Sequence, residues 1–139
     1  MGDYGDPPAA TVDRVRAICT TLPEVHEEPA WVGTRWRVRT RTFAHVLDIA
    51  HDAPPVLASA AESVGPATIV AFRSTGDELD ALRHAGPPYL YLGWGRNAVG
   101  LVLDHDTDWD EVAELVTESY CLLAPKKLSA QVVRPPEAG

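Results

Sequence analysis

A run of four arginines at every second position, in the stretch TRWRVRTRTF (residues 34–43), constrains the fold of this chain more than any other feature. The arginines are Arg35, Arg37, Arg39 and Arg41, here called the arginine stripe. Successive side chains of a β-strand point to opposite faces, so a two-residue period of charged and uncharged residues predicts a strand. We therefore expect a strand over residues 35–39, with Arg35, Arg37 and Arg39 on one face.

The residues that follow predict a hairpin and the rest of a sheet. Residues 40–42 can form a turn, so that the hairpin tip lies near residues 39–42 and Arg41 belongs either to the turn or to a strand face. The other strands are predicted by their β-branched, aromatic and apolar content. They are FAHVLDIA (43–50), ATIVAFR (67–73), PPYLYLGW (87–94) and AVGLVLD (98–104). A turn at residues 95–97 joins the last two into a second hairpin.

Apolar residues at helical spacing predict helices over residues 12–22, within 74–86 and over 109–124. The expected caps and stops are Thr11 and Pro23, Ser74 or Thr75 and Gly86, and Thr107 or Asp108 and Pro125. Residues 23–31 and 51–66 are expected to be a loop and a connector. After Pro125 we expect a tail, in which the two lysines complement the negative helix end.

The order of these elements predicts the architecture. Helix, three strands, helix, two strands and helix indicate an α+β domain, a mostly antiparallel sheet of about five strands flanked by helices. The length of 139 residues suits one domain. We expect a disordered N-terminal tail over 1–10, the domain over 11–129 and a C-terminal tail over 130–139.

Charge is distributed unevenly along the chain. The formal net charge is −8, which works against nonspecific binding to nucleic acid or to an anionic membrane. Residues 104–118 hold seven acids and no base, whereas residues 35–41 hold four arginines and no acid. Such a split can produce a dipolar molecule with two different faces. Because no apolar run approaches the roughly 20 residues that span a bilayer, and the N-terminus is unlike a secretory signal, we expect a cytoplasmic protein without membrane partners.

No residue pattern predicts a metal, a cofactor or a catalytic centre. Cys19 and Cys121 have no CxxC partner and are interpreted as small buried thiols on helices. The five histidines share no metal-ligand spacing. The stretch DHDTDWDE places aspartates at alternate positions, but Trp109 stands where a calcium loop needs Gly and Leu115 where it needs Glu. We interpret these acids as helix caps, with loose divalent binding as the lesser alternative.

Four fragments, in this order, resemble the MmcQ/YjbR-like family. They are LPEVHEEPAW, RWRVRTRTFAHV, TIVAFR and the block LVLDHDTDWDEVAELVTESYCLLAPKKL, which together cover roughly residues 11–129. The resemblance implies a CyaY-like fold, no catalytic residue set, and DNA binding through two β-hairpin wings. The chain departs from the family pattern at both turns. Residues 39–42 replace a turn that often carries Gly and Lys, and Trp94 precedes the second turn, whereas many relatives have Trp after it, where Ala98 stands here.

Two interpretations of the arginine stripe stay open. Arginines at alternate strand positions lie about 7 Å apart, close to the phosphate spacing along one DNA strand, and guanidinium groups bind phosphate bidentately. The same residues are also typical of the solvated face of an antiparallel sheet. The candidate nucleic-acid-binding residues are Arg35, Arg37, Arg39 and Arg41 with Trp94, Arg96 and Asn97 of the second hairpin. Arginines would hold phosphates and Trp94 would stack or wedge.

The leading hypothesis is a non-enzymatic protein that binds DNA weakly and salt-sensitively through both hairpins, with the acidic last helix pointing away. The first alternative is a protein-interaction module, in which the basic hairpin or the acidic helix docks a partner or a second copy. Ion pairs between the arginines and the acids of residues 104–118 would favour it. The second alternative is a small-molecule-binding domain or an enzyme of unknown reaction, which needs a concave apolar site with converging polar groups.

Overall fold

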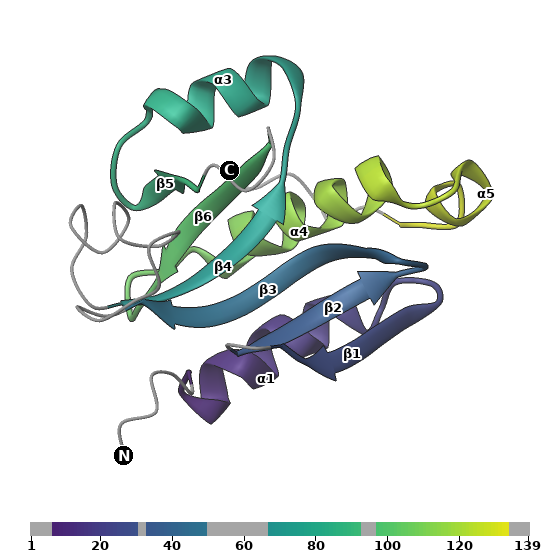
Figure 1. Ribbon diagram of the computed structural model, residues 1–139, viewed down its shortest axis with the longest axis horizontal. Helices are drawn as coiled ribbons and strands as arrows, with labels where there is room; N and C mark the ends of the chain where they lie inside the picture. The colour runs from purple at the N-terminus through teal and green to yellow at the C-terminus, as the bar shows by residue number, and fades with distance from the viewer. Residues whose placement is uncertain (1–6, 31–32, 50–66, 93–96, 134–139) are drawn as a thin grey trace.

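A computed structural model describes residues 7–30, 33–49, 67–92 and 97–133 of the chain (Figure 1). Within these residues, six strands form one antiparallel sheet in the order β1–β2–β3–β4–β6–β5. The strands are β1 Val25–Pro29, β2 Thr34–Val38, β3 Arg41–Ile49, β4 Ala67–Arg73, β5 Tyr89–Tyr91 and β6 Ala98–Leu103. The first four follow one another as a meander, and β6 then pairs with β4 and leaves β5 at the edge.

Helices accompany the sheet. They are α1 Ala9–Cys19, α3 Gly76–His84, α4 Trp109–Leu123 and α5 Lys126–Ser129. In Figure 1, α1 and α4 lie across one face of the sheet, and α3 lies beside β5 and β6. No helix among the described residues is long and apolar enough to cross a membrane.

The main core lies between the sheet and the helices α1 and α4. Trp36 and Val38 of β2 are fully buried there, on the face opposite the arginines. The rings of Phe43 and Tyr120 meet edge to face, with 5.2 Å between their centroids. This geometry is favourable for aromatic pairs, and it fixes the second half of α4 against the start of β3.

The opposite face of the sheet carries a second, smaller apolar cluster. Its buried members are Leu47, Ile49, Ile69, Ala71, Leu90, Leu92 and Ala98. Toward β2 the same face becomes polar, because His45, Arg35 and Arg37 follow in the cross-strand rows. One face of the sheet is therefore mainly apolar, with polar residues such as Glu27 and Asp48 toward its margins, whereas the other changes from apolar to basic.

A β-bulge in β3 shapes the boundary between these two parts. Trp36 stands opposite Ala44, but the next residue, Arg37, stands opposite Thr42, so Phe43 is the extra residue. The buried Ser119 of α4 bridges β3 and β4 beside the bulge. Its hydroxyl donates to the Phe43 carbonyl at 2.7 Å and accepts from the Arg73 amide at 2.8 Å. Ser119 thereby satisfies two backbone groups in the sheet.

The predicted α+β architecture with an antiparallel sheet is confirmed, but the sheet has six strands rather than about five. The additional strand is β1, in the stretch predicted to be a loop. Its burial does not alternate, and Pro29 and acidic residues argue against a central strand. β1 is an edge strand that backbone pairing and the ion pairs of Glu28 hold to β2, and a hydrophobic pattern does not reveal such a strand.

Several element ends also differ from the prediction. Helix α1 begins at Ala9, with Pro8 rather than Thr11 at the N-cap position. It ends at Cys19, before the predicted stop at Pro23. The predicted tail after Pro125 forms the short helix α5. Asp108 caps α4 as expected, accepting from the amides of residues 110 and 111 at 3.0 and 3.2 Å. The connector 51–66 and the outer parts of both predicted tails, 1–6 and 134–139, lie outside the described residues.

Candidate nucleic-acid interface

The alternation of the arginine stripe is confirmed in β2. Arg35 and Arg37 are partly exposed, and Trp36 between them is fully buried. The register with β1 places Glu28 opposite Arg35 and His26 opposite Arg37. The exposed side of β2 is therefore not a row of isolated cations, because a carboxylate from the neighbouring strand lies within it.

Glu28 binds both arginines of this strand. Arg35 donates from Nε to Glu28 Oε1 at 2.6 Å and also forms an ion pair with it through Nη2. Arg37 donates from Nη1 to the same oxygen at 3.2 Å and from Nη2 to the Thr40 carbonyl at 2.8 Å. The hydrogen bond from Arg35 is the main reason that the pKa of the Glu28 carboxyl lies below its usual value. Much of the donor capacity of these arginines therefore serves to hold β1, β2 and the turn together.

The predicted row of three strand-face arginines is broken after Arg37. Arg39 has a φ of +58° and lies in the β2–β3 turn, so it does not continue the strand period. Its Nη2 is 3.5 Å from Oε1 of Glu24, and both side chains are about half exposed, at 48% and 52%. Arg41 is exposed as the first residue of β3, opposite Val38, and so belongs to a strand rather than to the turn. Residues 39–41, the hairpin tip, thus present two accessible guanidinium groups.

The hairpin tip and the acids that precede and begin α4 lie at different ends of that helix, whereas Glu114 and Glu118 lie along it. Near the C-terminus of α4, the Tyr120 hydroxyl donates to the Pro23 carbonyl at 2.6 Å. The next residue, Glu24, is the one that pairs with Arg39 of the hairpin tip. Figure 1 shows α5, with its exposed Lys126 and Lys127, toward the same end of the molecule as the β2–β3 turn. Residues 108–111 begin α4, which at 15 residues is about 22 Å long. The five acids of residues 104–111 are therefore separated from the hairpin tip by the length of α4.

The second predicted hairpin is only partly described. Trp94 and Arg96 lie outside the described residues. Asn97 lies directly before β6, where its Oδ1 accepts from Nη1 of Arg73 at 3.1 Å. Tyr89 packs against the main core and donates its hydroxyl to Glu111. The pKa of Tyr89 is raised, mainly by burial and next by the hydrogen bond to Glu111. This favours a structural role for the ring.

A cavity of about 180 Å³ opens on the sheet face that carries the arginines, between the first hairpin and β6. It is lined by Arg35, Thr42, His45, Ala71, Phe72, Arg73 and Ala98, and is called the sheet cavity below. Burial lowers the pKa of the Arg73 guanidinium. The sequence interpretation missed His45, Thr42 and Arg73 as candidates. A signal was present in ATIVAFR, where Arg73 is the one charge at the end of an apolar strand.

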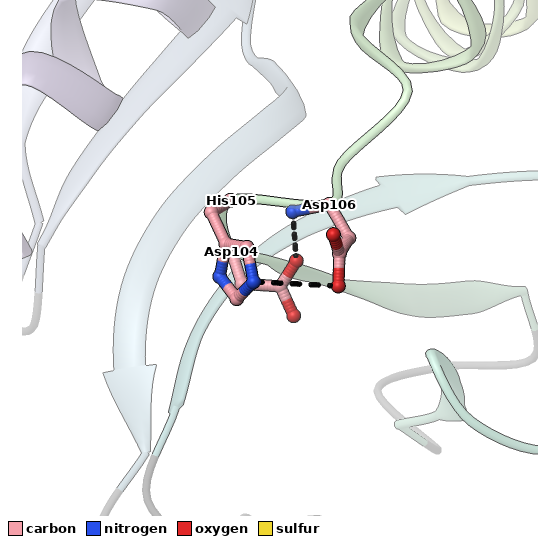
Figure 2. A group of neighbouring side chains, drawn as sticks. All are labelled: Asp104, His105 and Asp106. Carbon is pink, nitrogen blue, oxygen red and sulfur yellow. Dashed lines mark hydrogen bonds and ion pairs between the residues drawn. The ribbon is translucent and has the colours of Figure 1, made fainter.

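The acidic loop before α4 gathers three exposed residues that could each offer one ligand atom to a cation, within 4.8 Å of one another (Figure 2). They are Asp104, His105 and Asp106. The Asp106 amide donates to Asp104 Oδ1 at 2.8 Å, and His105 Nε2 is 3.5 Å from Asp106 Oδ2. These contacts shape the turn that leads to the Asp108 cap, and such exposed groups are common in proteins without a metal. We assign no metal site to them.

Neither cysteine forms a disulfide. Cys19 is fully buried in the main core, as predicted, and burial raises the pKa of its thiol. Cys121 is only half-buried, and it packs against the main core from α4. A high pKa disfavours the reactive thiolate, so Cys19 is a packing residue rather than a nucleophile.

Comparisons with known proteins agree with this fold. The model of the YjbR family matches residues 20–122. The crystal structure of the Deinococcus radiodurans protein DR2400, with a DUF419 domain, is similar with a TM-score of 0.59 and 20% sequence identity, covering 92% of this chain and 93% of that one. At this identity the likeness shows a shared fold alone. No curated protein matches the chain.

Proposed function

The chain belongs to the YjbR family, and from this premise we propose that it is a non-enzymatic binding protein whose β2–β3 hairpin contacts the phosphates of DNA. The observation that carries the proposal is the separation of charge along the molecule. Exposed arginines occupy the hairpin tip, and the acidic residues that begin α4 lie at the far end of that helix. A polyanion can approach the tip without meeting the strongest negative charge.

The arginines contribute unequally in this proposal. Arg39 and Arg41 are the primary phosphate contacts, because they are the more accessible pair. Arg35 and Arg37 share Glu28, so a phosphate gains less from them. Asn97 is partly engaged with Arg73, and contacts by Trp94 and Arg96 stay a prediction from the sequence.

The charges predict weak binding with a clear salt dependence. Around the hairpin, the four arginines face two carboxylates, Glu24 and Glu28, while the whole chain carries −8. Two phosphates neutralised at the tip correspond to a slope of roughly −2 in a plot of log affinity against log salt concentration. Binding should therefore be measurable at low salt and much reduced at physiological salt.

Fluorescence anisotropy with labelled mixed-sequence duplex and single-stranded DNA tests the proposal. The test variant is Arg39→Glu/Arg41→Glu. The matched control is Arg14→Glu/Arg83→Glu, which changes the net charge equally at exposed positions of α1 and α3. We expect saturable binding by the unmodified protein and by the control, with a loss of roughly tenfold or more in the test variant. No saturable binding at low salt, or an equal loss in both variants, would overturn the proposal.

The alternative of a protein-docking module receives no specific support. That alternative predicts ion pairs between the arginines and the acids of residues 104–118. Within the part of the chain that the structure describes, the ion pairs of the stripe join it to Glu24 and Glu28. These acids belong to β1 and the residue before it, so the pairs stabilise the sheet edge itself.

A further inference from the structure

We propose that the sheet cavity binds a small phosphate monoester, independently of the contact between the hairpin tip and DNA. The cavity is bounded by β2, β3, β4 and β6, and its polar lining consists of Arg35, Thr42, His45 and Arg73. Arg35, Thr42 and His45 belong to one hairpin, and Arg73, which is distant in the sequence, joins them because β4 pairs with β3.

The sheet register explains why these side chains converge. Arg35 stands opposite His45, and His45 stands opposite Ala71, so the three form one row across adjacent strands. In the next row, Arg73 of β4 stands opposite Ala98 of β6. Alanine at these two positions leaves space that a larger side chain would fill. The bulge at Phe43 brings Thr42 into the same region.

The chemistry of the lining suits an oxyanion. Arg35, Arg73 and His45 line the cavity, and none of the described residues that line it is acidic, although Glu28 beside it neutralises part of the Arg35 charge. Guanidinium groups bind phosphate oxygens through paired N–H donors, and the Thr42 hydroxyl supplies a further donor. The Arg73 guanidinium is partly buried and is oriented by Asn97. A partly desolvated cation is held in place before the anion arrives, which reduces the cost of ordering it on binding.

The size of the cavity suits a small ligand. Drug-sized ligands occupy pockets of about 300–1,000 Å³, whereas this cavity has about 180 Å³. That is about six times the ~30 Å³ share of one water molecule in the liquid. A phosphate group with a few carbon atoms fits this space. The same chemistry occurs in small phosphorylated metabolites and at the phosphorylated end of a nucleic-acid strand.

An NMR titration with inorganic phosphate and with glycerol phosphate tests the site, at ionic strength held constant with chloride. We expect saturable shifts of the backbone amides of Thr42, Ala71 and Arg73 and of the Arg73 side chain. In Arg73→Gln the dissociation constant should rise roughly tenfold or more, as expected when a charge-assisted contact is lost. Shifts that stay linear with phosphate concentration, or that centre on the hairpin tip, would refute the site.

Ala71→Val separates a shaped site from general attraction, because it fills the cavity, suits a strand and changes no charge. We expect it to weaken phosphate binding as strongly as Arg73→Gln. If Arg73→Gln fails to unfold cooperatively with temperature, Ala71→Val and His45→Ala decide the outcome. Unchanged affinity in a folded Ala71→Val variant would overturn the proposal.

Two further arms separate this site from the proposed DNA contact. The variant Arg39→Glu/Arg41→Glu should keep its phosphate affinity within about twofold, since neither residue lines the cavity. A short oligonucleotide with a 5′-phosphate is compared with the same strand without it. A preference for the phosphorylated strand that Ala71→Val abolishes identifies the strand end as the source. Equal binding of both strands, with glycerol phosphate still bound, identifies a metabolite.

Discussion

The two faces of the sheet differ in what the same strands contribute to them. On one face, Trp36 and Val38 of β2 are sealed beneath α1 and α4. On the other face, Arg35 and Arg37 of the same strand pair with Glu28. Arg35 also lines the sheet cavity. The two-residue period of β2 thus places the residues that stabilise the core on one face and the charged residues on the other. Substitutions on the two faces should have effects of different kinds.

Strand β1 repeats this division in two neighbouring glutamates. Glu27 faces the helices, where it accepts from Arg16 Nε at 2.7 Å and from the buried Trp36 Nε1 at 2.9 Å. Glu28 faces the opposite side and holds Arg35 and Arg37. One carboxylate therefore anchors α1 and the core to the edge strand, and the next one moderates the basic surface.

The largest expected effect is on the helix-covered face. Trp36→Ala removes a fully buried ring and should lower the free energy of unfolding by about 3–5 kcal/mol, measured by urea denaturation. Trp36→Phe keeps most of the apolar ring but removes the donor to Glu27, so its loss should be intermediate. Arg35→Ala, on the other face of the same strand, should cost far less. A similar loss for Arg35→Ala and Trp36→Ala would contradict the division between the faces.

Ser119 of α4 binds the backbone of β3 and β4 at the bulge, and its removal should have a smaller effect on stability. Ser119→Ala leaves the Phe43 carbonyl and the Arg73 amide without this buried hydroxyl, a loss of about 1–3 kcal/mol in unfolding free energy. Ser129→Ala, which removes a hydroxyl contact inside α5, is the matched control, with an expected change within about 0.5 kcal/mol. Hydrogen exchange at the Arg73 amide should accelerate only in Ser119→Ala. Unchanged protection of that amide would show that the bridge is not needed.

The smallest change in stability should distinguish the two glutamates. Glu27→Gln should cost about 1–2 kcal/mol at neutral pH, since this carboxylate, a third exposed, accepts charge-assisted hydrogen bonds. The hydrogen bond from Arg16 is the main reason that the pKa of Glu27 is lowered. Its stabilisation is therefore complete above the unfolded-chain pKa of about 4.3 and is lost as pH falls through the lower folded pKa. The difference between Glu27→Gln and the unmodified protein should shrink over that range in urea denaturation.

Glu28→Gln should act on binding as well as on the attachment of β1 to β2. It removes a carboxylate that competes for Arg35 and Arg37, so anisotropy should show tighter DNA binding at low salt, and the NMR titration should show tighter phosphate binding. Glu27→Gln should leave both affinities nearly unchanged, because its carboxylate faces the helices. Equal effects of the two substitutions on binding would mean that the two faces are not electrostatically distinct.

Elements with a strong local pattern were predicted well. The β2–β3 hairpin, β4 and the capped helix α4 each carry a clear hydrophobic period or cap. β1 was missed because pairing with one neighbour, rather than burial of alternate residues, makes it a strand. The candidate site was predicted in part. Arg35 and Arg37 lie on the predicted face, but Arg39 leaves it at the turn, and the carboxylate that binds both was assigned to a loop.

The sequence by itself determined which residues of β2 are buried and which are exposed, because strand periodicity is a local property of the backbone. It also determined that positive and negative charge belong to different segments. Only the tertiary structure decided which charges meet. Glu28 reaches Arg35 through the β1–β2 register, and Arg73 joins His45 and Arg35 through the order of the strands. These contacts depend on the register and the order of the paired strands, which the residue period of a single strand does not encode.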